Sequence, residues 1–277
     1  MQLQEGSRIS TDKGCFFLED DLQSTQARVF KATDSKKRAC VLKFPHPAYP
    51  NTVFQELFRR EEAVNRELQG LPGIVAAQET ILCSLGEETI PALLFPYVAA
   101  KDFGHAVKEL PYAQRAEKTL HYAFQIAQSL AHIHRNHYVH ADLAPANILV
   151  NSKEQSYIID FGTSYHVDMA PTSYTRPFFA SPEMRRHLAF CKSPKPLMAT
   201  DIYSLGMIIL RTNALCISAN TDDFIQEPNY RKEFIEDTLE DLPGALRGIC
   251  SLCLSERPED RPNADELSSM LQQYSFQ

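Results

Sequence analysis

Two short polar segments, each beside an apolar run, constrain this chain more than any other feature of its sequence. The first, YVHADLAPANILV, covers residues 138–150 and places Asp142 and Asn147 just before the run ILV. The second, YIIDFGTS, covers residues 157–164 and places Asp160 directly after another apolar run. Because short apolar, β-branched runs are typical of buried strands, we expect these polar side chains to lie in loops at strand ends. Either segment alone is compatible with a polar turn between strands, but the two occur together and in order.

The order of strand and helix patterns predicts an α+β fold in two parts. Before residue 50, the segments FFLEDD, ARVFKAT and ACVLKF are short and rich in β-branched and aromatic residues. A helix over residues 54–69 and the apolar strand IPALLFPYVAA follow, and helical spacing then dominates from about residue 116. The sequence therefore predicts one domain, 1–277, with a β-rich part at about 16–99 and a mainly helical part at about 102–277.

The helix predicted over residues 54–69 has a carboxylate on its apolar face. The apolar stripe consists of Phe54, Leu57, Phe58 and Leu68. Glu61 falls on the same stripe, whereas the neighbouring Glu62 falls off it. A carboxylate that points inward needs a partner, so Glu61 is the candidate for a buried polar contact.

Charge, hydropathy and cysteine content exclude several classes of protein. The net charge of −7 argues against a nucleic-acid partner, which would require a basic surface. No run approaches the roughly 20 apolar residues of a membrane span, and the start, MQLQEGSRISTDKG, lacks the apolar core of a signal peptide. Seven cysteines, an odd number in a long chain, indicate a reducing compartment. We expect a cytoplasmic protein, with export as an effector the alternative, and no pattern sets its oligomeric state.

The two polar segments resemble the catalytic and metal-binding loops of the eukaryotic-like (Hanks-type) protein kinases of the Ser/Thr type. The pattern H-x-D-L-x-x-x-N is met by His140, Asp142, Leu143 and Asn147, and D-F-G is met by residues 160–162. The resemblance implies a two-lobed kinase fold that binds ATP and Mg²⁺. It also implies that Asp142 accepts or orients the proton of the attacking hydroxyl, while Asn147 and Asp160 hold magnesium.

The same resemblance assigns residues to the ATP site. Lys43, in CVLKF, matches the strand lysine that contacts the α- and β-phosphates, and its partner is Glu61, with Glu62 the rival. Near adenine, the resemblance implies a gatekeeper, two backbone contacts and three apolar side chains around the ring. Phe95 is the implied gatekeeper, and Pro96 and Val98 make the implied backbone contacts. The implied apolar side chains around the ring are those of Val29, Val41 and Leu149.

Later segments extend the resemblance to about residue 272. Ser181-Pro182-Glu183 stands where the family has A-P-E, and Asp201 opens DIYSLGMIIL as the family's buried helix does. Arg261 resembles the late arginine that pairs with the glutamate of A-P-E. These matches are structural, because they shape the surface that receives a protein substrate.

The sequence departs from the family pattern at several positions. The segment of residues 22–27, where the family has its glycine-rich phosphate loop, contains no glycine. Ala144 stands where Ser/Thr kinases place a lysine that contacts the γ-phosphate, and Ala141 replaces the arginine of H-R-D. Arg176 stands where the family has its substrate-loop threonine, although Thr175 is only one residue away.

The pattern as a whole predicts a protein kinase that transfers the γ-phosphate of Mg-ATP to Ser or Thr of a protein substrate. A small-molecule kinase of the aminoglycoside-phosphotransferase type is one alternative, since such enzymes share the catalytic core and often lack the loop lysine. A pseudokinase scaffold is another, and the missing glycines and Ala144 favour it.

Overall fold

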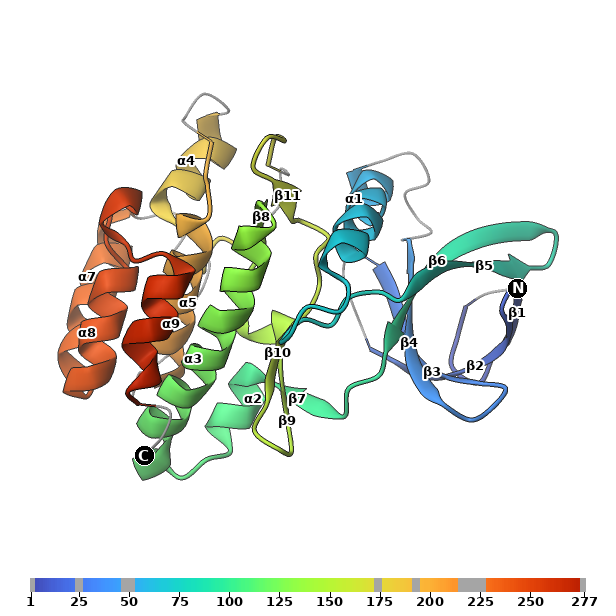
Figure 1. Ribbon diagram of the computed structural model, residues 1–277, viewed down its shortest axis with the longest axis horizontal. Coiled ribbons are helices and arrows are strands. Elements are labelled where there is room, and N and C mark those ends of the chain that lie inside the picture. The colour runs from blue at the N-terminus through green and yellow to red at the C-terminus, as the bar shows by residue number, and fades with distance from the viewer. Residues whose placement is uncertain are drawn as a thin grey trace. The chain divides into compact units, whose positions relative to one another are not determined.

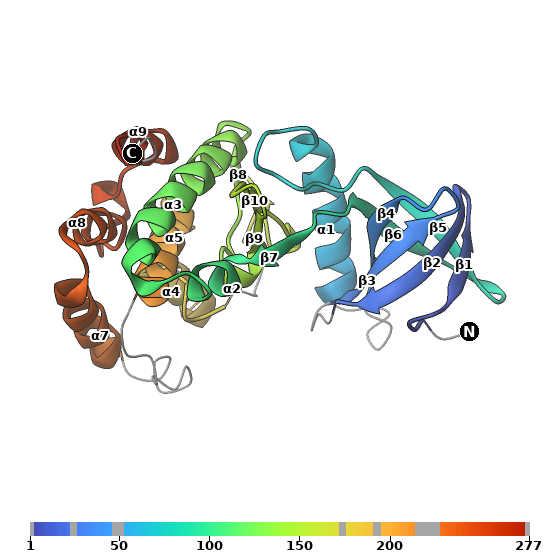
Figure 2. The ribbon, with the colours of Figure 1, turned by 90° about the horizontal axis from the view of Figure 1, so that it is seen from below.

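The computed structural model describes residues 3–22, 27–45, 53–171, 176–190, 195–213 and 228–274. The chain forms two compact units, Met1–Ala99 and Ala100–Gln277. The first is rich in strands and the second is mainly helical, as Figures 1 and 2 show. This division confirms the predicted α+β fold.

The strands of the first unit form a closed antiparallel barrel in the order β1-β2-β3-β4-β6-β5. Their bounds are β1 (Arg8–Thr11), β2 (Gly14–Asp21), β3 (Ala27–Asp34), β4 (Ala39–Pro45), β5 (Glu79–Leu85) and β6 (Glu88–Pro96). Alternate residues point inward, and the buried core includes Phe30, Leu42 and Phe44. Strands β1 and β5 were not predicted from the sequence, and β1 extends the strand-rich part to before residue 16.

The intervening residues of β3, β4 and β6 line the other face of the sheet. Val29 pairs with Lys43 across β3 and β4, and Val41 pairs with Phe95 across β4 and β6. Because strand side chains alternate, these four residues lie on one face, opposite the barrel core.

Helix α1 (Val53–Leu68) is the only helix assigned among the described residues of the first unit. It begins and ends one residue earlier than predicted. Its buried residues include Leu57, Glu61 and Asn65, as its amphipathic spacing requires. The Asn65 amide donates to the Glu61 carbonyl at 2.7 Å and accepts from the Ala77 N–H at 2.8 Å, which joins the helix to the chain that follows it.

The second unit combines short strands with several helices. The strands are β7 (Ala100–Asp102), β8 (Tyr138–Val139), β9 (Ile148–Asn151), β10 (Ser156–Ile158) and β11 (Tyr165–His166), which pair in the orders β10-β9-β7 and β11-β8. The α-helices are α2 (Phe103–Lys108), α3 (Tyr112–Arg135), α4 (Pro182–Phe190), α5 (Ala199–Asn213), α7 (Pro228–Asp241), α8 (Gly244–Cys253) and α9 (Ala264–Gln272). Helix α3 starts at Tyr112, four residues earlier than the spacing predicted. It begins directly after Pro111, whose backbone is not helical.

Helix α5 forms the centre of the helical core. Its residues from Thr200 to Leu210 are all buried, as expected from the resemblance of DIYSLGMIIL to the family's buried helix. It packs against α8, where a Cβ added to Gly206 would lie 2.7 Å from the Cβ of Cys253. Cys250 and Cys253 are both fully buried and are not bonded to each other, so these two cysteines pack in the core on one face of α8.

Candidate active site

The catalytic-loop residues lie between β8 and β9. A 3₁₀ turn, η1 (Pro145–Asn147), begins at a proline, whose fixed φ suits the first position of a helical turn. This turn brings Asn147 next to Asp142: the Asn147 amide nitrogen donates to the Asp142 carbonyl at 2.8 Å and to its carboxylate Oδ2 at 3.3 Å. Only 4% of Asp142 is exposed. The structure therefore brings these two predicted site residues together.

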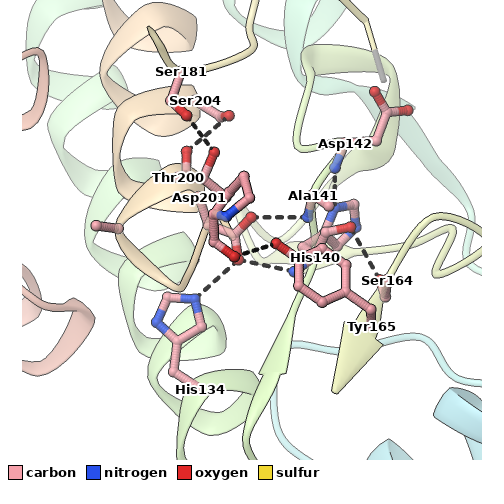
Figure 3. Close-up of polar contacts among 12 residues, drawn as sticks. His134, His140, Ala141, Asp142, Ser164, Tyr165, Ser181, Thr200, Asp201 and Ser204 are labelled. Carbon is pink, nitrogen blue, oxygen red and sulfur yellow. Dashed lines mark hydrogen bonds and ion pairs between the residues drawn. The ribbon is translucent and has the colours of Figure 1, made fainter. Parts of the chain in front are cut away.

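The backbone that leads into Asp142 is fixed by the carboxylate of Asp201, at the start of α5 (Figure 3). Its Oδ2 accepts from the His140 N–H at 2.8 Å and contacts His134 Nε2 at 2.9 Å, and its Oδ1 accepts from the Ala141 N–H at 2.9 Å. Ala141 has a φ of +68°, in the left-handed region that costs a residue other than glycine about 1–2 kcal/mol. Asp201 thus holds the loop in a backbone conformation that it would not adopt by itself.

The segment with Asp160 is joined to the same loop. The Ile159 N–H donates to the Asn147 carbonyl at 3.0 Å, and the Ile159 carbonyl lies 3.1 Å from His140 Nε2. The ring of Phe161 packs edge-on against His140 with centroids 5.3 Å apart. These contacts fix Asp160 close enough to Asp142 for its charge to act on the Asp142 carboxyl.

Arg176 contacts the Asp142 carboxylate twice. Its backbone N–H donates to Oδ1 at 2.8 Å, and its guanidinium Nη1 donates to Oδ2 at 2.9 Å. Burial raises the pKa of the Asp142 carboxyl, whereas the charge and backbone N–H of Arg176 act to lower it. The sequence analysis placed Arg176 at a threonine position and did not predict this contact. The one signal in the sequence was Ala144 at the position of the family's lysine, because it implies that another residue supplies a positive charge near Asp142.

Lys43 and Glu61 form a close ion pair within the first unit. Lys43 Nζ lies 2.8 Å from Glu61 Oε1 and 2.6 Å from Oε2, and the glutamate side chain is 2% exposed. Glu62 instead accepts a hydrogen bond from the Thr80 hydroxyl at 2.7 Å. The helix phase predicted from the apolar stripe is therefore the one that the structure has.

The residues predicted around adenine are distributed over both units. Val29, Val41 and Phe95 lie on the sheet face that presents Lys43, with Phe95 buried and the two valines half-buried. Pro96 ends β6 and is exposed, Val98 is half-buried in the segment that follows, and Leu149 is half-buried on β9 of the second unit. Their contacts to adenine stay predictions.

A second buried ion pair stabilises the C-terminal part of the second unit. Arg261 donates to Glu183 through Nη1 at 2.7 Å and Nη2 at 3.0 Å, and its side chain is 0% exposed. Arg231 donates to the carbonyls of Pro177 and Ala180 at 3.2 and 3.0 Å. Both arginines therefore fix the chain around α4, which follows Arg176.

The donor chemistry near Asp142 fits magnesium. The Asn147 amide contacts Asp142 through its nitrogen. The amide oxygen of Asn147 and the carboxylate of Asp160 are the kind of hard ligand that Mg²⁺ prefers, and these two residues would hold the metal. No cluster of three or more His, Cys, Asp or Glu side chains suited to a metal occurs in the described residues. Residues 23–26 of the glycine-free segment and Thr175 lie outside the described residues.

A strand-rich first unit followed by a mainly helical second unit is the element order of the two-lobed kinase fold. A model of the protein kinase domain matches residues 23–272, so the chain belongs to the protein kinase family. It is 26% identical over 266 residues to a probable serine/threonine-protein kinase of Clostridium acetobutylicum, covering 90% of this chain and 38% of the relative. It is 28% identical over 198 residues to the mitogen-activated protein kinase kinase kinase YODA of Arabidopsis thaliana, covering 68% and 22%. The chain thus spans well under half the length of these relatives.

None of its described helices is long and apolar enough to cross a membrane.

Proposed function

We propose that this protein transfers the γ-phosphate of Mg-ATP to a Ser or Thr hydroxyl of a protein substrate. The observation that carries the proposal is the arrangement around Asp142. This carboxylate is buried and oriented by Asn147, and it lies in a loop whose backbone is fixed by Asp201. Phosphoryl transfer depends mostly on positioning and charge, and such a loop supplies both.

Each residue has a defined task in this proposal. Asp142 accepts or orients the proton of the substrate hydroxyl, and its carboxylate needs little reorganisation because its neighbours already fix it. ATP and magnesium, when bound, would supply the phosphoryl group and neutralise its charge. Asn147 and Asp160 would hold the metal, and Lys43, kept in place by Glu61, would contact the α- and β-phosphates.

The adenine site is proposed from the same pattern. Val29, Val41 and Leu149 would enclose the ring, Phe95 would limit the depth of the site, and the backbone of Pro96 and Val98 would bind the adenine edge. A proline at 96 fits this role, because only its carbonyl is required.

Two features favour a protein acceptor over a small molecule. The buried Glu183–Arg261 pair fixes the chain that, in the family resemblance, forms the protein-substrate surface. Relatives from Clostridium acetobutylicum and Streptomyces coelicolor are named as probable serine/threonine-protein kinases, which supports Ser or Thr as the acceptor. We also propose a cytoplasmic site of action, in line with the cysteine content.

The test is incubation with Mg-ATP labelled on the γ-phosphate, together with generic protein substrates and the chain itself. We expect label on Ser or Thr, and Asp142→Ala should reduce transfer ~10²–10⁴-fold. Lys43→Ala should weaken productive ATP binding. ATP binding without protein labelling would instead support a small-molecule acceptor or a nucleotide-binding pseudokinase, and absence of both would support a scaffold.

A further inference from the structure

The catalytic loop of this chain lacks a cation of its own. Ala144 occupies the position two residues after Asp142, and its side chain is a methyl group that is 1% exposed. Ala146, two residues further on, brings no charge either. The loop therefore offers two small apolar side chains where a transferred phosphoryl group would require positive charge.

Arg176 brings a cation to the same carboxylate from 34 residues further along the chain. The guanidinium contacts Asp142 Oδ2 through a single nitrogen, Nη1, at 2.9 Å. Because a guanidinium has five N–H donors, this contact leaves donors that point elsewhere. The arginine side chain is 35% exposed while Asp142 is 4% exposed, so the cation lies at the rim of the site, with the carboxylate beneath it.

We propose that Arg176 is a positioning residue of this active site and supplies the positive charge that the catalytic loop lacks at Ala144. This inference rests on the proposed phosphotransfer. The arginine orients Asp142 toward the acceptor hydroxyl and places a cation beside the reacting groups. The contacts with Arg176 and Asn147 fix both oxygens of the Asp142 carboxylate in place.

The neighbouring structure supports a fixed place for this arginine. The residues just after it are anchored by Arg231, which donates to the carbonyls of Pro177 and Ala180. The backbone N–H of residue 176 also donates to Asp142. Since that bond does not depend on the side chain, substitutions at 176 change the cation while they leave the backbone contact intact.

The experiment measures kcat and the KM for ATP of Arg176→Gln and Arg176→Lys. Arg186→Gln is the matched control, because it removes an exposed arginine from α4. We expect Arg176→Gln to lower kcat by roughly 10–100-fold with the KM for ATP changed by less than about 3-fold. Lysine satisfies a contact made by one nitrogen, so Arg176→Lys should keep kcat within about 5-fold of wild type. Arg186→Gln should match wild type, and thermal melts of all variants verify that they fold.

Several results would overturn the inference. An unchanged kcat in Arg176→Gln would show that the charge is dispensable, and a higher kcat would show that the arginine obstructs Asp142. Equal losses in the glutamine and lysine variants would point to packing rather than charge. Transfer that is active in wild type but insensitive to Arg176 refutes this inference alone, whereas no transfer by wild type refutes the proposed function with it.

Discussion

Replacing Asp201 by asparagine tests how the catalytic loop is held. The wild-type carboxylate is fully buried and its two oxygens contact three donors, the N–H groups of His140 and Ala141 and Nε2 of His134. An asparagine has one acceptor oxygen, so in its better orientation its amide keeps the two contacts of Oδ2. It then turns an NH₂ group toward the Ala141 N–H, which leaves two donors facing each other.

The expected loss follows from these contacts. A hydrogen bond to a charged group contributes ~1.5–3 kcal/mol, and an unsatisfied buried donor costs about 1–3 kcal/mol more. We expect Asp201→Asn to lower the free energy of unfolding by about 3 kcal/mol, which corresponds to a melting temperature lowered by roughly 6–12 °C. Because Ala141 then loses the bond that holds its left-handed backbone, kcat should fall by about 10²-fold.

Differential scanning calorimetry and the phosphotransfer assay measure the two effects. Asp265→Asn is the control: this carboxylate is exposed and pairs with Arg135 at the surface, so its loss should cost less than about 1 kcal/mol. If Asp201→Asn melted within about 2 °C of wild type, the loss would be under 1 kcal/mol and the proposed role of the carboxylate would be refuted.

Three further predictions concern other buried groups. In steady-state kinetics, Glu61→Gln should raise the KM for ATP several-fold and Glu62→Gln should leave it unchanged, because only Glu61 pairs with Lys43. Equal effects of the two substitutions would contradict this. Arg261→Met should lower the free energy of unfolding, measured in urea, by ~3–5 kcal/mol, because it leaves Glu183 buried without its bidentate partner. A loss under about 1 kcal/mol would contradict this role of the ion pair. Burial raises the pKa of the Cys83 thiol from 9.0 to about 12, so the unfolded chain ionises first and stability falls between these pH values. Under reducing conditions, Cys83→Ala should flatten that alkaline decline in melting temperature, and identical pH profiles would exclude a contribution of this thiol.

Local periodicity was sufficient to predict the placement of Glu61. A helix has a fixed angle per residue, so the apolar stripe of α1 determines which of two adjacent carboxylates points inward. The structure pairs Glu61 with Lys43, as that phase requires. In the same way, the mostly apolar side chains of residues 202–210 are enough to predict that α5 is buried.

Short strands and distant contacts were harder to predict. β1 has four residues, RIST, of which only Ile9 is a large apolar residue, so too little alternation is present to mark a strand. Its place in the barrel depends on pairing with β2 and β5, which no local pattern contains. Arg176 is a similar case, because its contact with Asp142 is created by the path of the chain between them rather than by either local sequence.

The close approach of α5 and α8 at Gly206 limits how this sequence can vary. Any side chain at 206 would place its Cβ 2.7 Å from that of Cys253 and 3.0 Å from a methyl group of Leu254, closer than atoms in contact can lie. Truncating Cys253 to glycine would remove one obstacle but put a flexible residue near the end of α8. A substitution at position 206 is therefore tolerated only if Cys253 and Leu254 change with it. Engineering of this core by single substitutions should begin at other positions.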